Sequence, residues 1–243
     1  MLIEFRASNY RSIAEEQILS LVPSKGQGDY VSNIFTVGNF DVLNGAALYG
    51  PNNGGKSNLL RALRLMDNFL FTSSKLNSTA PLPYDPNLLI AGYHEKPTGF
   101  EVTFLIDTVR YRYGFQFDRK SVHREWLYRK KVGREVELFY READVIEVSS
   151  GLDGKTSLIN TAIEATRSNG LFLSFCDMLN VDEAKKIFAW FKRLIHVDGL
   201  DTSSEEINTI SLIESSEDFK HKILTYLNRL GFNFSDIEVL RKH

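Results

Sequence analysis

The sequence contains a single cysteine, Cys176, and no apolar stretch that approaches the roughly 18 residues of a membrane-spanning helix. One cysteine excludes a disulfide within the chain and is typical of a protein from a reducing compartment. Because Cys176 lies in the apolar run 171–179, we expect a core thiol and not a nucleophile. The N-terminus also lacks a signal-peptide pattern, so we expect a cytoplasmic protein with no membrane partner.

An excess of charge of either sign is also missing. The chain has 29 Lys and Arg against 31 Asp and Glu, a net charge of −2, which gives no global case for binding nucleic acid or membrane. Its 243 residues allow one large domain or two small ones. The sequence has no internal repeat, no histidine placed at metal-ligand spacing and no Gly-x-Ser-x-Gly motif. We therefore expect no nuclease or protease centre within the chain.

The clearest motif is Gly50-Pro51-Asn52-Asn53-Gly54-Gly55-Lys56-Ser57, which fits G-x-x-x-x-G-K-[ST], the phosphate-binding loop of P-loop NTPases. We expect a short buried strand at 46–49 before the loop and a helix over 56–71 after it. In this arrangement backbone N–H groups and a helix N-terminus surround a phosphate. Lys56 would reach the β- and γ-phosphates of ATP, and the Ser57 hydroxyl would bind Mg²⁺.

The patterning along the chain predicts four segments. The first, 1–71, contains a hairpin over 1–23, short strands at 34–37 and 41–43, and the P-loop. The second, 72–99, holds four of the six prolines, and we interpret it as a solvated loop or insertion in preference to a functional lid. Apolar residues at every second position predict an antiparallel meander over 100–150. The last segment, 151–243, is expected to be helical and to end in the start of a further strand at 237–240.

Within this last segment, helical spacing covers 171–179 and 183–195, with Asp182 as the N-cap of the second helix. Residues 198–216 are polar and are expected to form a loop. Residues 219–230 are expected to form an amphipathic helix that Gly231 ends.

A local excess of cations occurs within the meander. Residues 110–134 hold Arg110, Arg112, Arg119, Lys120, Arg124, Arg129, Lys130, Lys131 and Arg134 against Asp118 and Glu125, with aromatic residues interleaved. Such a surface would track phosphates and stack bases of DNA. The alternation equally predicts the solvated face of a half-buried sheet, and we favour that interpretation.

A second motif lies at the N-terminus, Asn9-Tyr10-Arg11-Ser12-Ile13, and the P-loop region continues as Gly50-x-Asn52-x-x-Gly55-Lys56-Ser57-Asn58. Together these motifs resemble the ABC-type ATPases of the SMC, RecF and OLD group. The whole chain looks closest to the AAA family ATPases of prokaryotic antiphage and abortive-infection systems, the Septu PtuA-like group. Only the first sixty or so residues carry sharp motifs.

This resemblance implies an α/β fold: an ABC-type P-loop NTPase head, with a mixed sheet around the P-loop helix, plus an antiparallel β-subdomain and a helical segment. It implies ATP and Mg²⁺ as ligands, a head-to-head dimer or higher oligomer, and a partner effector such as a nuclease. Arg11 would reach toward the nucleotide phosphates, as a guanidinium near a γ-phosphate offsets its charge. The implied ATP-binding residues are Asn52, Asn53, Gly54, Gly55, Lys56, Ser57, Asn58 and Arg11.

Two parts of such a site have no convincing match. A Walker B segment would end in Asp-Glu, but Asp107 is followed by Thr108, and 194–198 is interrupted by His196. No signature loop is present. No glutamine fits the Q-loop, the position whose glutamine couples Mg²⁺ to the signature domain in such ATPases, and Met178 lies about where that glutamine would be. We therefore expect an N-terminal portion of such a head, which binds ATP–Mg²⁺ weakly or not at all in isolation and does not hydrolyse it.

Three functions stay open at this point. The first is an ATPase head that controls a defence effector through nucleotide-dependent dimerisation. The second is an ATP-binding assembly or sensor protein without hydrolysis. The third is a DNA-maintenance ATPase of SMC or RecF type, against which the short meander and the lack of a heptad arm argue.

Overall fold

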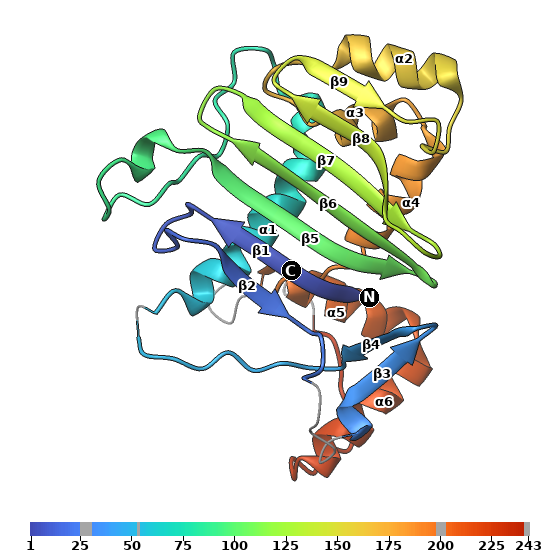
Figure 1. Cartoon of the computed structure of the whole chain (residues 1–243). Helices are drawn as coiled ribbons and strands as arrows, with labels where there is room; N and C mark the ends of the chain where they lie inside the picture. Colours follow the sequence, from blue (N-terminus) through green and yellow to red (C-terminus); the bar gives the residue numbers. More distant parts are fainter. Residues whose placement is uncertain (25–30, 53, 198–202, 241–243) are drawn as a thin grey trace. The chain divides into compact units, whose positions relative to one another are not determined.

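The computed structural model describes residues 1–24, 31–52, 54–197 and 203–240 (Figure 1). The chain forms two compact units, Met1–Leu194 and Ile195–His243. The first unit contains both sheets and the P-loop motif, so it carries most of the fold described below.

A seven-stranded sheet is the centre of the first unit, and all its neighbouring strands pair antiparallel. The expected N-terminal hairpin and meander are confirmed, and they belong to this one sheet because β1 pairs with β5. In spatial order its strands are β2 (Gln17–Ser20), β1 (Leu2–Ser8), β5 (Thr98–Ile106), β6 (Val109–Phe117), β7 (Val122–Lys130), β8 (Val136–Glu142) and β9 (Val145–Val148).

One face of this sheet is apolar, and helices cover it (Figure 1). The period-two pattern of the strands places aromatic rings on this face, where Phe69 of α1 (Lys56–Thr72) packs edge-on against Phe115. Phe104 of β5 stacks on Trp190 of α4 (Asp182–Phe191) with ring centroids 4.1 Å apart. The helix after the P-loop therefore lies directly on the sheet core, with Ala62 and Met66 fully buried.

A buried carboxylate attaches α3 (Phe172–Met178) to the same face. Glu125 of β7 is fully buried and accepts hydrogen bonds from the backbone N–H groups of Phe172 (2.6 Å) and Leu173 (3.0 Å). Tyr113 donates to the same carboxylate at 3.0 Å, and Arg141 lies 3.8 Å from it. Burial raises the pKa of Glu125, although these donors favour its charged form. The helix N-terminus is thus held by a carboxyl group that the sheet supplies.

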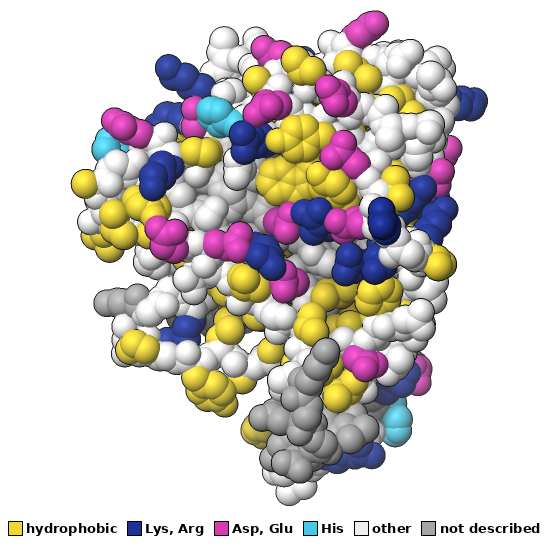
Figure 2. Space-filling model, viewed as in Figure 1, with side chains coloured by type: hydrophobic (Ala, Val, Ile, Leu, Met, Phe, Trp, Pro, Cys, Tyr) yellow, Lys and Arg dark blue, Asp and Glu magenta, His cyan; other side chains and the backbone are white. Residues whose placement is uncertain are grey.

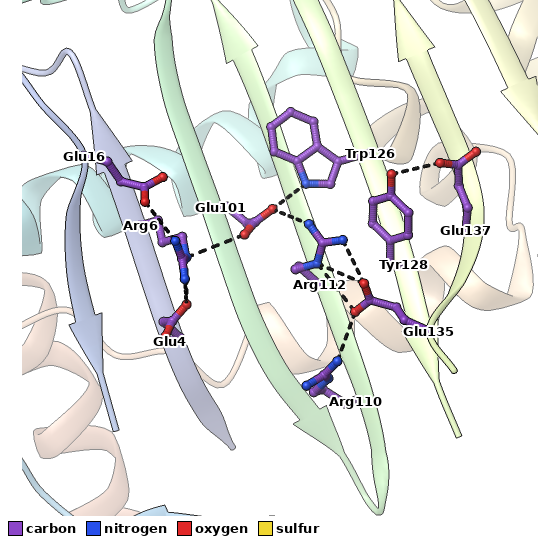
Figure 3. A network of polar contacts seen from close by, with 10 residues as sticks. All are labelled: Glu4, Arg6, Glu16, Glu101, Arg110, Arg112, Trp126, Tyr128, Glu135 and Glu137. Carbon is purple, nitrogen blue, oxygen red and sulfur yellow. Dashed lines mark hydrogen bonds and ion pairs between the residues drawn. The ribbon is translucent and has the colours of Figure 1, made fainter. Parts of the chain in front are cut away.

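The opposite face of the sheet is open and polar. Figure 3 shows Arg112 between Glu101 and Glu135, at 2.9 and 2.8 Å, and Arg110 at 3.3 Å from Glu135. Trp126 donates to Glu101 at 2.7 Å. In Figure 2 basic and acidic side chains are interspersed over this face, with apolar and aromatic side chains between them. Its charges therefore neutralise one another locally.

The remaining elements of the first unit are short. A separate two-stranded sheet pairs β3 (Ile34–Val37) with β4 (Phe40–Leu43), as the sequence predicts. The 72–99 segment contains only two 3-10 turns, Ser73–Lys75 and Tyr93–Glu95, and no strand before Thr98. Another helix, α2 (Thr156–Ala165), contacts α3. Cys176 is buried in the core, as expected, and burial raises the pKa of its thiol.

The second unit contains α5 (Ser203–Ser215) and α6 (Glu217–Arg229). Ser216 caps α6 by accepting a hydrogen bond from the Phe219 N–H at 3.2 Å. Gly231 follows the helix with φ +88°, which confirms the expected glycine ending.

Several expectations were wrong. Residues 46–49 form no strand but an exposed extended segment, and Tyr49 is 91% exposed. The mixed sheet around the P-loop helix is absent from the described residues, because the helix packs on an antiparallel sheet instead. Residues 203–215 are helical where we expected a loop, and 237–240 form no strand. Residues 198–202 lie outside the described part.

A smaller correction concerns α4. Asp182 is its first residue, and Val181 occupies the N-cap position. Asp182 forms an ion pair with Lys185 at 2.7 Å, so its carboxylate contributes within the first turn and not as a cap.

Candidate functional site

The P-loop motif leads directly into α1, as predicted. Gly55 is the N-cap of this helix, and the Leu59 N–H donates to its carbonyl at 3.0 Å. The Gly54 N–H donates to the Pro51 carbonyl at 3.1 Å, which closes a tight turn before the helix. The strand expected before the loop is missing, so the loop is positioned from its helical side only.

Lys56 points back over its own loop. Its Nζ donates to the carbonyls of Gly50 and Pro51, both at 2.7 Å. The ammonium group therefore lies next to the loop peptides, which a bound phosphate would also contact. The contacts are exposed, so the side chain can exchange these two carbonyls for phosphate oxygens at little cost.

A hollow of about 380 Å³ lies beside the loop. Two of the eight predicted ATP-binding residues, Lys56 and Ser57, line it, and its other walls are apolar. Its lining residues, all in the described part of the chain, are Leu19, Leu21, Ala46, Leu48, Lys56, Ser57 and Leu60. They include no carboxylate, so Mg²⁺ would find the Ser57 hydroxyl here but no acidic ligand.

The N-terminal motif folds into a turn that contacts the P-loop region. Tyr10 and Ile13 form an isolated bridge, and Ser12 lies at the tip between them. The Ser12 hydroxyl accepts a hydrogen bond from the Asn58 amide at 2.8 Å. A Cβ built on Gly55 would lie only 3.2 Å from the same hydroxyl. Two motifs more than forty residues apart are therefore in contact.

Arg11 projects from this turn toward the 72–99 segment. Its Nε lies 2.6 Å from the Asp85 carboxylate, and its backbone N–H donates to the Asp85 carbonyl at 2.8 Å. The side-chain hydrogen bond to the Asp85 carboxylate raises the pKa of Arg11, so the residue is charged at every physiological pH. The guanidinium also lies 5.5 Å from the centre of the Tyr10 ring.

The predicted ATP-binding residues therefore fall into three groups. Gly54, Gly55, Lys56 and Ser57 form the end of the loop and the start of α1. Asn52 is exposed, and Asn58 is engaged with Ser12, while Asn53 lies outside the described residues. The turn that carries Arg11 contacts α1, whereas the Arg11 side chain contacts Asp85.

The sequence analysis missed Asp85 and Asn87. Asn87 is 2% exposed, and its amide donates to the Arg11 carbonyl at 2.8 Å. Its backbone N–H donates to the Asn9 side chain at 3.0 Å. These contacts span more than seventy residues, and no local pattern signals them. The 72–99 segment is thus attached to the N-terminal turn, which corrects the expectation of a solvated connector.

Asp107, which ends the better of the two candidate Walker B segments, does not line the P-loop hollow. Asp107 lies in the turn between β5 and β6 with φ +52°. It lines a different hollow, together with Met1 and Trp190. Residues 194–197 form no strand, and Asp198 lies outside the described residues. Within the described part of the chain, no group of three or more His, Cys, Asp or Glu is arranged to hold a metal ion.

The cation-rich stretch 110–134 is partly neutralised. Arg112 and Arg110 pair with carboxylates on the open face, as Figure 3 shows, and Arg124 pairs with Glu142 at 3.0 Å. Arg129 is turned to Glu183 at 2.9 Å. The pairs on the open face are what a solvated sheet face predicts, whereas Arg129 pairs with a fully buried carboxylate of α4.

A family model described as "AAA domain, putative AbiEii toxin, Type IV TA system" matches residues 46–148. The match begins just before the P-loop motif and ends at the last strand of the sheet, and it covers less than half of the 243 residues. It supports an AAA-type P-loop ATPase domain linked to toxin–antitoxin and abortive-infection systems. No curated protein matches the chain significantly. None of the described helices has the length and apolar character needed to cross a membrane.

Proposed function

We propose that this chain is an ATP-binding, ATPase-type head of a defence system. The observation that carries the proposal is the hollow beside α1, which is lined by Lys56 and Ser57 of a G-x-x-x-x-G-K-[ST] loop. The family match supports the nucleotide-binding class and the link to abortive infection. Asn52, Asn53, Gly54, Gly55, Lys56, Ser57, Asn58 and Arg11 are the proposed ATP-binding residues.

The chemistry follows from the loop. The phosphates would lie over the Gly55 peptide at the N-terminus of α1, where the first N–H groups of a helix lack an intrahelical partner and the helix dipole favours an anion. Lys56 would leave the Gly50 and Pro51 carbonyls for phosphate oxygens. Ser57, which is exposed, would offer its hydroxyl to Mg²⁺.

Hydrolysis would need a carboxylate on Mg²⁺ or on the attacking water, and the described lining of the hollow has none. We therefore propose that this chain binds ATP without turning it over. This observation also favours the second candidate function, an ATP-binding assembly or sensor protein. In the first candidate, ATP would drive self-association of two or more heads that control an effector protein such as a nuclease.

DNA remains a further candidate partner, through the cations of 110–134 for which the described residues show no ion pair. These are Arg119, Lys120, Lys130, Lys131 and Arg134. Their number is small, so we rank this partner below a second copy of the chain.

The test is an equilibrium titration of the whole chain with ATP–Mg²⁺, together with an assay of phosphate release. We expect weak but saturable binding that Lys56→Ala weakens at least tenfold, because the substitution removes the charge over the phosphates. Lys131→Ala, which removes an exposed lysine charge elsewhere, should bind like the unchanged chain. Phosphate release should stay at background. Binding that is indifferent to Lys56→Ala would contradict the proposed site, and release abolished by Lys56→Ala would contradict the absence of turnover.

A further inference from the structure

The turn that carries Arg11 is fixed from two sides. On one side, Ser12 accepts a hydrogen bond from Asn58 of α1. On the other, Asn9 is 3% exposed and its amide donates to the carbonyls of Tyr93 (2.8 Å) and Lys96 (2.6 Å). Asn9 and Arg11 both have positive φ, +49° and +51°, a conformation that costs free energy and persists only where contacts enforce it. The 85–97 stretch supplies most of those contacts.

Asn87 is the centre of this attachment. Its amide donates to the Arg11 carbonyl at 2.8 Å, and its backbone N–H donates to the Asn9 side chain at 3.0 Å. Its own side-chain oxygen accepts from the backbone N–H groups of Leu89 and Ile90, both at 3.0 Å. Every polar atom of this buried amide is therefore in use, and the main chain at Arg11 is tied to the 85–90 stretch.

The Asp85 carboxylate and the Tyr10 ring hold the Arg11 side chain. Asp85 binds the guanidinium through Nε at 2.6 Å, and the guanidinium lies 5.5 Å from the centre of the Tyr10 ring. In the described part of the chain, no hydrogen bond engages the two terminal nitrogens, Nη1 and Nη2. The guanidinium is a planar, rigid fork, so the Nε bond and the ring contact together restrict the direction in which the two terminal nitrogens point. Those two nitrogens are the pair that binds phosphate oxygens in a bidentate way.

We propose that Asp85 is a positioning residue for the nucleotide phosphates: it holds Arg11 by Nε so that Nη1 and Nη2 are presented to the terminal phosphate of ATP. The proposal rests on the proposed function, because it needs a nucleotide at the P-loop. It also assigns a role to the 72–99 segment, which places Asp85 next to a turn more than seventy residues earlier in the sequence.

The exposure of the Arg11 and Asp85 side chains sets the expected loss of ATP affinity in their variants. The Arg11 and Asp85 side chains are 40% and 50% exposed, so their pair alone contributes little to stability. A contact from Arg11 to phosphate is charge-assisted and stronger, and we expect Arg11→Ala to weaken ATP binding about tenfold. Loss of Asp85 leaves Arg11 charged but unfixed, so Asp85→Ala should weaken ATP binding about threefold.

The experiment is a double-mutant cycle on ATP–Mg²⁺ affinity with Arg11→Ala, Asp85→Ala and the double variant, repeated with ADP. We expect the double variant to bind ATP as Arg11→Ala does, because Asp85 acts only through Arg11. ADP, which lacks the terminal phosphate, should bind all variants nearly equally. Glu164→Ala, an exposed carboxylate of α2 without a hydrogen bond or ion pair in the described residues, serves as the matched control and should bind both nucleotides normally.

Three results would overturn the assignment. Fully additive losses, or equal losses for ATP and ADP, would mean that Asp85 merely supports the fold. Tighter ATP binding by Asp85→Ala would mean that Asp85 withholds Arg11 from the nucleotide. All three results presuppose binding that depends on Lys56, so they are distinct from failure of the proposed function, in which Lys56→Ala leaves affinity unchanged. Asp85→Glu, which restores the carboxylate, should recover part of the ATP affinity and so separates positioning from misfolding.

Discussion

Gly55 is restricted by two independent features. Its φ of +85° is favourable for glycine only, and a Cβ at this position would lie 3.2 Å from the Ser12 hydroxyl. The same residue begins α1 and lies next to Lys56. The glycine thus permits both the turn into the helix and the close approach of the N-terminal turn.

We predict that Gly55→Ala weakens ATP–Mg²⁺ binding several-fold and lowers the free energy of unfolding by about 1–2 kcal/mol, the usual cost of a left-handed conformation for an L-residue. Gly133→Ala is the control, since Gly133 has φ +73° but no atom within 4 Å of the added Cβ. It should cost similar stability and leave binding intact. Thermal unfolding measures the stability of each variant, and titration of the folded variants measures ATP–Mg²⁺ binding. Equal binding losses in the two variants would argue against a special role for the loop.

At the scale of elements, Glu135 stabilises the open face of the sheet through its ion pairs with Arg110 and Arg112. Burial alone would raise the pKa of this carboxyl, but the hydrogen bonds and charges of Arg112 and Arg110 outweigh burial and bring the pKa below its ordinary value. A carboxyl with a lowered pKa contributes stability above its unfolded pKa of about 4.5. That contribution disappears as the pH falls through the folded value.

Glu135→Gln should therefore lower the free energy of unfolding by about 1 kcal/mol at pH 7, and the difference from the unchanged chain should shrink as the pH falls below about 4.5. Chemical denaturation at a series of pH values measures this difference in the free energy of unfolding. Glu142→Gln breaks the more exposed pair with Arg124 and should cost less at pH 7. A difference for Glu135→Gln that stays constant down to pH 3 would refute the pKa argument.

Elements with a strong local pattern were predictable from the sequence. The strands from Thr98 to Val148 alternate apolar and polar residues, and α1 has helical apolar spacing after a glycine-rich loop. Residues 46–49 misled the prediction because an apolar run indicates burial but does not say what covers it. The 203–215 helix was missed because its polar composition hides its periodicity.

The candidate site was predictable only where it is local. The motif places Lys56 and Ser57 at the start of a helix, and the structure does so too. The resemblance puts Arg11 near the nucleotide, but the contact between Ser12 and Asn58 was not predicted. Asp85 and Asn87 could not be predicted, because their partners are distant in sequence and their segment has no regular pattern.

For the whole molecule, charge is arranged to cancel locally. The stretch 110–134 has an excess of cations, yet Arg112 and Arg129 each lie between two carboxylates. The net charge of −2 agrees with this pattern. A net charge near zero gives no general long-range attraction for nucleic acid, and we propose the loop at the start of α1 as the site that binds an anion.

The most direct test of this account is amide hydrogen exchange of the whole chain with and without saturating ATP–Mg²⁺. We predict slower exchange in residues 54–58 and in the turn from Asn9 to Ile13 when the nucleotide is bound, and no such change in Lys56→Ala. Protection that leaves 54–58 unchanged, or that persists in Lys56→Ala, would contradict the assignment of the P-loop as the nucleotide site.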